Sequence, residues 1–255
     1  MSKGLTKALK LEFNDMKERK ISLLFYLLVP AIIIWIYYIS ATMTINWGDY
    51  ASLNLKLYDL FASDVFSIII IFITTQLMVL RIVGERAPYG TLDRELIAIS
   101  RIGMYFGKLF ANLIFVLLQV IIIYIFGFII FPARNYGSPI PILLFLFLIA
   151  LFGLISGLTI SIFSKNKEQA IQLIPFFVLI LLLFSGLFVP LDQMPGNIRL
   201  IAENMPLTLG SQSLKMLTLD GVGFEDVQFK MWKLLSWIGV ITLAGLVKFE
   251  LERNR

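Results

Sequence analysis

Few residues of this 255-residue chain could do chemistry, and they form no recognisable catalytic set. The chain contains no Cys and no His, which excludes disulfide frameworks, Cys/His zinc sites and any triad that uses a histidine base. It also lacks a GxxxxGK[ST] segment, the glycine-rich loop that cradles nucleotide phosphates. We therefore expect no catalytic residue, no metal site and no cofactor in this chain, and we do not expect it to be an enzyme by itself.

Uncharged polar side chains within apolar stretches are the remaining candidates for contact with a small molecule. Gln76, Asn112 and Gln119 form the candidate substrate path. Asn112 and Gln119 are seven positions apart, so a helix would present both on nearly the same face. Such groups also hydrogen-bond neighbouring helices, and that structural role is the alternative for each. The cores of the apolar stretches carry no Asp, Glu, Lys or Arg, which argues against a proton relay.

The composition indicates which elements hold these residues. Hydrophobic residues make up 58% of the chain, charged residues 15%, and the mean hydropathy is +0.86, values far from those of a soluble domain. A helix needs about 20 mostly apolar residues to cross a bilayer. Six stretches meet this length: 21–40, 58–80, 109–131, 140–163, 171–190 and 231–249. We predict an all-α integral membrane protein with six transmembrane helices in a single domain, 1–255. Gly153 and Gly157, four positions apart, predict close helix packing.

The basic residues predict the orientation of the chain. If the N-terminus is cytoplasmic, the inner segments contain 16 of the 22 Lys and Arg residues, although inner and outer segments are nearly equal in length. An excess of positive charge marks the cytoplasmic side of a membrane. We predict a multi-pass protein of the plasma membrane with both termini in the cytoplasm. This topology explains the net charge of +5, so we do not expect nucleic acid as a partner.

Residues 1–20 have the pattern of an amphipathic helix. Leu5, Leu9, Phe13 and Met16 fall on one helical face, and lysines cover much of the rest. A helix of this kind lies in the membrane surface with its cations near anionic headgroups. We predict an interfacial helix, with a solvated basic leader as the alternative. A signal peptide is disfavoured because the apolar stretch that follows is long for one.

A second patterned segment follows the second apolar stretch, on the predicted cytoplasmic side. Pro88 and Gly90 interrupt the chain, and Thr91 can cap a new helix there. Three apolar residues then share one face: Leu92, Leu96 and Ile99. Charges of both signs lie beside them: Asp93, Arg94 and Glu95. An amphipathic helix with both charge signs suits docking to another protein, and a membrane-surface helix is the alternative.

The segment after the fifth apolar stretch is punctuated by proline. Pro190, Pro195 and Pro206 leave 197–204 and 207–219 as two candidate short helices, neither long enough to span a bilayer. Irregular backbone at membrane depth is tolerated where it is buried in protein or lines a cavity. We predict a re-entrant pair of helices that dips into the outer leaflet, with an ordinary folded loop as the alternative.

Three stretches of the chain, in the right order, resemble the permease subunits of type-2 ABC transporters. They are Glu85-Arg86…Gly90-Thr91-Leu92-Asp93 followed by Gly107-Lys108-Leu109, then Ser161-Ile-Phe-Ser-Lys-Asn-Lys-Glu-Gln-Ala170, then Ser185-Gly-Leu-Phe-Val-Pro-Leu-Asp-Gln-Met-Pro195 with Asn204-Met-Pro206. With the predicted topology, the resemblance covers nearly the whole chain. The sequence departs from the family pattern at Ala87, Pro88 and Tyr89, where a more charged run is common.

The resemblance implies a permease that dimerises, either with itself or with a related permease. Each copy would pair with a separate cytoplasmic ATP-binding subunit, which would bind ATP and Mg and drive export. Residues 1–20 would be the elbow helix of the family. The residues implied in coupling to the ATPase are Glu85, Arg86, Gly90, Thr91, Leu92, Asp93, Arg94, Leu96 and Ile99.

The nature of the cargo and two other classes of function stay open at this point. The apolar spans favour an amphiphilic, lipid-like or drug-like substrate, handled in contact with membrane lipid. A membrane scaffold or assembly protein is one alternative, because amphipathic segments can serve only to recruit proteins. An ion-coupled secondary carrier is the other.

Overall fold

The computed structural model describes residues 20–41, 56–85, 101–164 and 166–251. Within these ranges the secondary-structure elements are all helices, which agrees with the predicted all-α class. Residues 1–19 of the predicted interfacial helix and the predicted coupling helix in the segment 86–100 lie outside the described residues.

Ten helical elements make up the described part of the chain. In order they are α2 (Lys20–Ser40), α3 (Leu57–Glu85), α5 (Arg101–Tyr124), the π-helix η2 (Ile125–Ile130), α6 (Pro139–Phe163), α7 (Lys167–Leu183), the 3-10 helix η3 (Leu191–Gln193), α8 (Gly196–Glu203), α9 (Pro206–Thr218) and α10 (Phe224–Leu251). The six apolar stretches of the sequence fall on α2, α3, α5 with η2, α6, α7 and α10.

Four of the described helices are long and apolar enough to cross a membrane: α3, α5 with η2, α6 and α10. Within α2 the apolar helix is shorter, Tyr26–Ser40. Helix α7 has 17 residues, and at about 1.5 Å per residue it is ~25 Å long, less than the ~30 Å of a hydrocarbon core. These helices identify the chain as an integral membrane protein, while the count of six spans stays a prediction.

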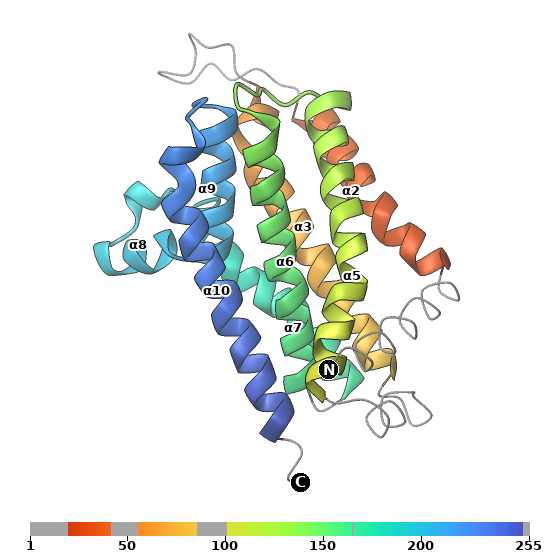
Figure 1. The fold of residues 1–255 in the computed structure, drawn as a ribbon. Helices are drawn as coiled ribbons and strands as arrows, with labels where there is room; N and C mark the ends of the chain where they lie inside the picture. The colour runs from red at the N-terminus through yellow and green to blue at the C-terminus, as the bar shows by residue number, and fades with distance from the viewer. Residues whose placement is uncertain (1–19, 42–55, 86–100, 165, 252–255) are drawn as a thin grey trace.

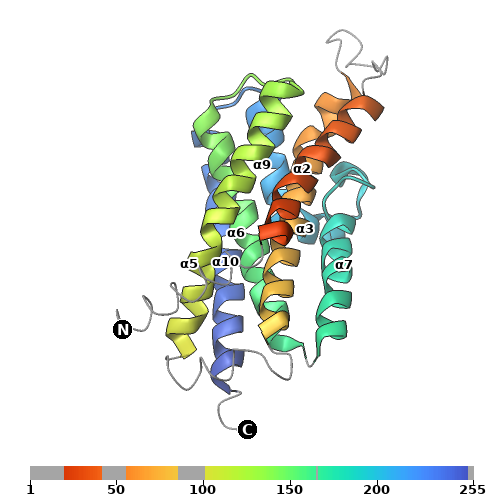
Figure 2. The ribbon, with the colours of Figure 1, turned by 90° about the vertical axis from the view of Figure 1, so that its right-hand side faces the viewer.

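The long helices form an up-and-down bundle (Figures 1 and 2). Helices α3, α6 and α10 begin at one end, where α2 and η2 stop; we call this the Ser40 end. Helices α3 and α10 run to the opposite end, where α5 and α7 begin; we call this the Glu85 end. Helix α7 stops below the Ser40 end in both views, and α9 fills the remaining height of the bundle.

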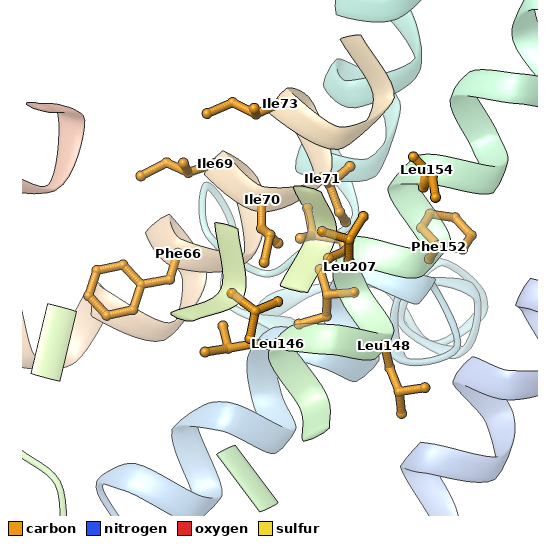
Figure 3. Close-up of a cluster of buried hydrophobic side chains, with 14 of the residues drawn as sticks. Phe66, Ile69, Ile70, Ile71, Ile73, Leu146, Leu148, Phe152, Leu154 and Leu207 are labelled. Carbon is orange, nitrogen blue, oxygen red and sulfur yellow. The ribbon is translucent and has the colours of Figure 1, made fainter. Parts of the chain in front are cut away.

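The core of the bundle lies between α3 and α6, with α9 packed beside both (Figure 3). Ile70 and Ile71 of α3, Leu146 and Phe152 of α6 and Leu207 of α9 are at most 1% exposed. A side chain of this size contributes about 1.5–3 kcal/mol when it is fully buried. The contact between α3 and α6 is therefore the main apolar contact of the molecule.

Two glycines allow the backbones of α3 and α6 to approach closely. A Cβ atom at Gly157 would stand 2.5 Å from the carbonyl oxygen of Thr75, and one at Gly153 would stand 3.0 Å from that of Ile71. The Thr75 hydroxyl uses this proximity and donates to the Gly153 carbonyl at 3.0 Å. The close packing predicted for this glycine pair is confirmed.

The prediction for the fifth apolar stretch, 171–190, was wrong at both ends. Helix α7 begins at Lys167, where the Asn166 side chain accepts from the Gln169 amide as an N-terminal cap, and it ends at Leu183. The chain leaves the helix through Gly186, whose φ of +85° is open to glycine and strained for other residues. Apolar composition continues to Pro190, so hydropathy alone overestimated the helix.

Candidate functional site

The segment implied in ATPase coupling is framed by two described helices. Glu85 is the last residue of α3 and Arg101 is the first of α5, so both helices reach the Glu85 end where the chain between them must pass (Figure 1). The other predicted coupling residues lie outside the described residues: Arg86, Gly90, Thr91, Leu92, Asp93, Arg94, Leu96 and Ile99.

A buried polar junction joins α3 to α5 next to this segment. Arg81 donates to the side-chain oxygen of Asn112, whose amide nitrogen donates to the carbonyl of Lys108 at 2.7 Å. Arg81, Lys108 and Asn112 are at most 5% exposed. Hydrogen bonds to a charged group are stronger than neutral ones. The junction therefore holds α3 and α5 together near the Glu85 end.

The sequence placed Arg81 and Lys108 in the cytoplasmic loop, beyond the ends of the apolar stretches. Both residues instead lie within helices and are buried. Hydropathy could not predict the burial of these two residues. It assigns every Arg and Lys the same polar value, whether or not a hydrogen-bond partner is present. The only sequence signal was that two cations and an amide occur near the ends of consecutive apolar stretches.

The three residues of the candidate substrate path lie on two helices, α3 and α5. Asn112 and Gln119 share the buried face of α5, as predicted, whereas Gln76 lies half-buried on α3. No hydrogen bond joins any two of them among the described residues. The Asn112 amide is committed to Arg81 and Lys108. The Gln119 amide nitrogen is buried, with no hydrogen-bond partner in the described part of the chain.

The three prolines of the predicted re-entrant segment lie where helices begin. Pro190 precedes η3, Pro195 precedes α8, and Pro206 is the first residue of α9. Proline is tolerated there because the first residues of a helix have no intrahelical partner for their N–H groups. The bounds of α8 and α9 agree within one residue with the predicted short helices, 197–204 and 207–219.

Helices α8 and α9 differ sharply in burial. Ten of the 13 residues of α9 are buried, so this helix is part of the bundle and not a surface loop. In α8 only Ala202 is buried, and the helix projects from the side of the bundle (Figure 1). The sequence predicted both helices but not this contrast, because α9 buries polar as well as apolar residues.

Hydrogen bonds from α10 and α7 fix this pair of helices. Trp237 Nε1 donates to the Asn204 carbonyl and Lys233 Nζ donates to the Asn204 side-chain oxygen, each at 2.7 Å. The Thr208 hydroxyl donates to the carbonyl of Phe184 at 2.9 Å. These contacts join residues 24 to 33 positions apart, so no local spacing in the sequence could have indicated them.

The chain has recognisable relatives. The pattern of the ABC-2 type transporter family matches residues 21–217. The chain is 25% identical over 215 residues to ABC transporter G family member 20 of Dictyostelium discoideum, covering 83% of this chain and 29% of that protein. It is 28% identical over 114 residues to the linearmycin resistance permease protein LnrN of Bacillus subtilis (strain 168), covering 44% of this chain and 29% of that protein. The chain thus matches less than a third of the length of either relative.

The family match and the fold agree. The matched residues run from α2 into the last turn of α9 and include the α3–α6 core and all three prolines that begin η3, α8 and α9. The family is a transmembrane component and not itself the ATPase, which is consistent with a chain that has no phosphate-binding loop. The chain therefore belongs to the ABC-2 type transporter family and is a type-2 ABC permease.

Proposed function

We propose that this permease is the membrane subunit of an ATP-driven exporter, powered by a separate ATP-binding subunit that docks on the segment 86–100. The observation that carries the proposal is the buried junction of Arg81 and Asn112. It ties together the ends of α3 and α5, the two helices that lead into and out of this segment. A displacement of the segment by the ATP-binding subunit would be transmitted to the bundle through both helices at once.

The proposed complex contains two permease copies and two ATP-binding subunits, in the plasma membrane, with the Glu85 end in the cytoplasm. The excess of Lys and Arg in the segments at this end supports the orientation. We propose that α2 and α7 also span the membrane, and that α8 and α9 form a re-entrant pair that compensates for the short α7. The burial of α9 against α3, α6 and α10 supports this arrangement.

We propose an amphiphilic substrate. The name of one relative links that protein to linearmycin resistance, and a permease that confers resistance is consistent with export. Helices α2 and α5 also expose large apolar side chains along their length, including Leu28, Trp35, Phe110 and Ile121. Such surfaces suit contact with lipid, with a second copy, or with a cargo that enters from the bilayer.

The coupling proposal is tested by placing a charge on the apolar face of the docking segment. Leu96→Asp would bury a carboxylate against the ATP-binding subunit, and an unpaired buried charge is costly. We expect the variant to insert normally but to lose the co-expressed ATP-binding subunit in a detergent pull-down, together with transport-linked ATP hydrolysis. Asp93→Arg should weaken the same association more mildly, through charge reversal at the rim.

A matched control introduces the same charge elsewhere. Leu200 is 66% exposed on α8, away from the Glu85 end, so Leu200→Asp should retain the ATP-binding subunit. If Leu96→Asp retains that subunit as fully as Leu200→Asp does, the segment 86–100 is not the docking site.

A further inference from the structure

A polar cavity of about 370 Å³ lies between α3, α8, α9 and the chain that joins α7 to α8. Its volume falls within the range of about 300–1,000 Å³ found for small-molecule sites. The charged and amide groups on its walls are Asp64 from α3, Asp192 from η3, Arg199 and Glu203 from α8, and Gln212 and Lys215 from α9. None of the candidate path residues lines this cavity.

The groups from η3 and α8 pair with one another. Arg199 contacts the Glu203 carboxylate at 2.7 Å and the Asp192 carboxylate at 3.3 Å. The hydrogen bond to Glu203, with the two negative charges, raises the pKa of the Arg199 guanidinium, which therefore stays charged. This exposed triad forms one rim of the cavity and, with two carboxylates and one guanidinium, carries one excess negative charge.

Asp64 and Lys215 are different, because both line the cavity and they are not paired with each other. Asp64 lies beside the Ser211 hydroxyl and within longer electrostatic range of Lys215. Neither side chain has an opposite charge within 4.0 Å among the described residues. Both are partly buried, and partial burial raises the free-energy cost of a charge that no partner satisfies.

Gln212 supplies a hydrogen-bond donor next to Lys215. Its amide oxygen accepts from the Lys230 ammonium of α10 at 3.1 Å, which leaves the amide NH₂ group for another partner. The wall from α9 therefore offers an ammonium and an amide donor, whereas the wall from α3 offers a carboxylate. A ligand that satisfies both walls needs an anionic group at one end and a cationic group at the other.

Exposed apolar side chains flank the wall residues of the chain between α7 and η3. The chain from α7 to η3 carries Phe188 and Val189, 63% and 44% exposed, next to the wall residues Gly186 and Pro190. A polar cavity with an apolar border fits the headgroup of an amphiphile whose tail stays outside.

We propose that this cavity binds a zwitterionic headgroup that carries an ammonium and a phosphate, as in phosphatidylethanolamine. The ammonium pairs with Asp64, and the phosphate is held by Lys215 and the Gln212 amide. The apolar border favours a lipid over a water-soluble phosphoethanolamine. Binding is independent of the proposed function, whereas a role of the cavity in passing on an exported amphiphile rests on it.

The test measures binding to the purified full chain, without the ATP-binding subunit. One arm reconstitutes the protein in phosphatidylglycerol nanodiscs with a small fraction of phosphatidylethanolamine and measures retained lipid by native mass spectrometry. The other titrates glycerophosphoethanolamine, with ethanolamine and glycerol phosphate as single-charge probes. We expect retention of phosphatidylethanolamine and weaker binding of glycerophosphoethanolamine, with neither single-charge probe matching it. Binding in the second arm alone would assign the site to the soluble compound and overturn the lipid source.

Variants locate the site. Asp64→Asn and Lys215→Gln should each weaken binding by about tenfold or more, a loss of one ion pair, whereas Lys215→Arg should retain most of it and shows that the fold tolerates change there. Glu225→Gln removes a carboxylate from the exposed start of α10 and should have no effect. Unchanged binding in Asp64→Asn, or no binding of either zwitterion by the natural chain, overturns the proposal. Neither result depends on the ATPase, so failure here is distinct from failure of the permease function.

Discussion

At the scale of single residues, Asn112 and Gln119 show how two amides on one helix face can have different roles. Asn112 accepts from Arg81 and donates to the Lys108 carbonyl. Gln119 is 2% exposed, and its amide nitrogen has no partner in the described part of the chain. A buried polar group without a partner costs about 1–3 kcal/mol. Gln119 is therefore the better candidate for a functional contact, and Asn112 for a structural one.

Replacing each amide by leucine should separate the two roles. Asn112→Leu removes a hydrogen bond to the charged Arg81 and should lower the stability by about 1.5–3 kcal/mol. Gln119→Leu removes an unsatisfied group and should leave the thermal unfolding temperature in detergent unchanged or higher, while changing transport. Normal transport by a Gln119→Leu protein of normal abundance would remove Gln119 from the substrate path.

At the scale of elements, the positions of helices could be predicted far better than their ends and partners. The apolar stretches correctly located α2, α3, α5, α6 and α10. A helix that crosses a bilayer needs about 20 mostly apolar residues, and hydropathy detects such a stretch directly. Proline chemistry located α8 and α9. The end of α7 was not predicted, because the chain turns out of the helix at Gly186 through a positive φ angle. Most of the residues around Gly186 are apolar, so hydropathy gives no sign of this turn.

The contacts that build the candidate site could not be predicted from the sequence. Arg81 donates a hydrogen bond to Asn112, which is 31 positions away in the chain. Asp64 of α3 lines the same cavity as Lys215 of α9. Such pairings depend on how the helices pack, whereas the sequence gives only which face of each helix is polar. The residues that the family resemblance implies in ATPase coupling lie outside the described residues, apart from Glu85, so their role stays a prediction.

The turn after α7 offers a prediction at this scale. Gly186→Ala would force a residue with a Cβ into φ +85° and place that atom 3.1 Å from Leu191 Cγ. We expect a loss of about 1–2 kcal/mol, measured as a lower thermal unfolding temperature in detergent. Gly196→Ala is the control, because a Cβ there has open space and should change stability by no more than about 0.5 kcal/mol. Equal stability of the two variants would show that the turn bears no strain.

At the scale of the whole molecule, the two ends of the bundle should face opposite sides of the membrane. Ser138 precedes α6 at the Ser40 end and Glu168 lies in the first turn of α7 at the Glu85 end, and both are exposed. The absence of Cys from the chain makes single-cysteine labelling clean. A thiol reagent that cannot cross membranes should label Ser138→Cys only from outside the cell and Glu168→Cys only from the cytoplasm. Labelling of Ser138→Cys from the cytoplasmic side would reverse the topology.

The glycine contacts between α3 and α6 limit how the bundle can move. Sliding α6 along α3 by one residue, about 1.5 Å, would bring side chains into space that is open only at Gly153 and Gly157. We therefore expect shear between these two helices to be blocked and the pair to move as one rigid body during transport. We expect relative motion among the helices packed around this pair. The α3–α6 pair would then be the rigid part of the permease, and the helices around it would be its moving parts.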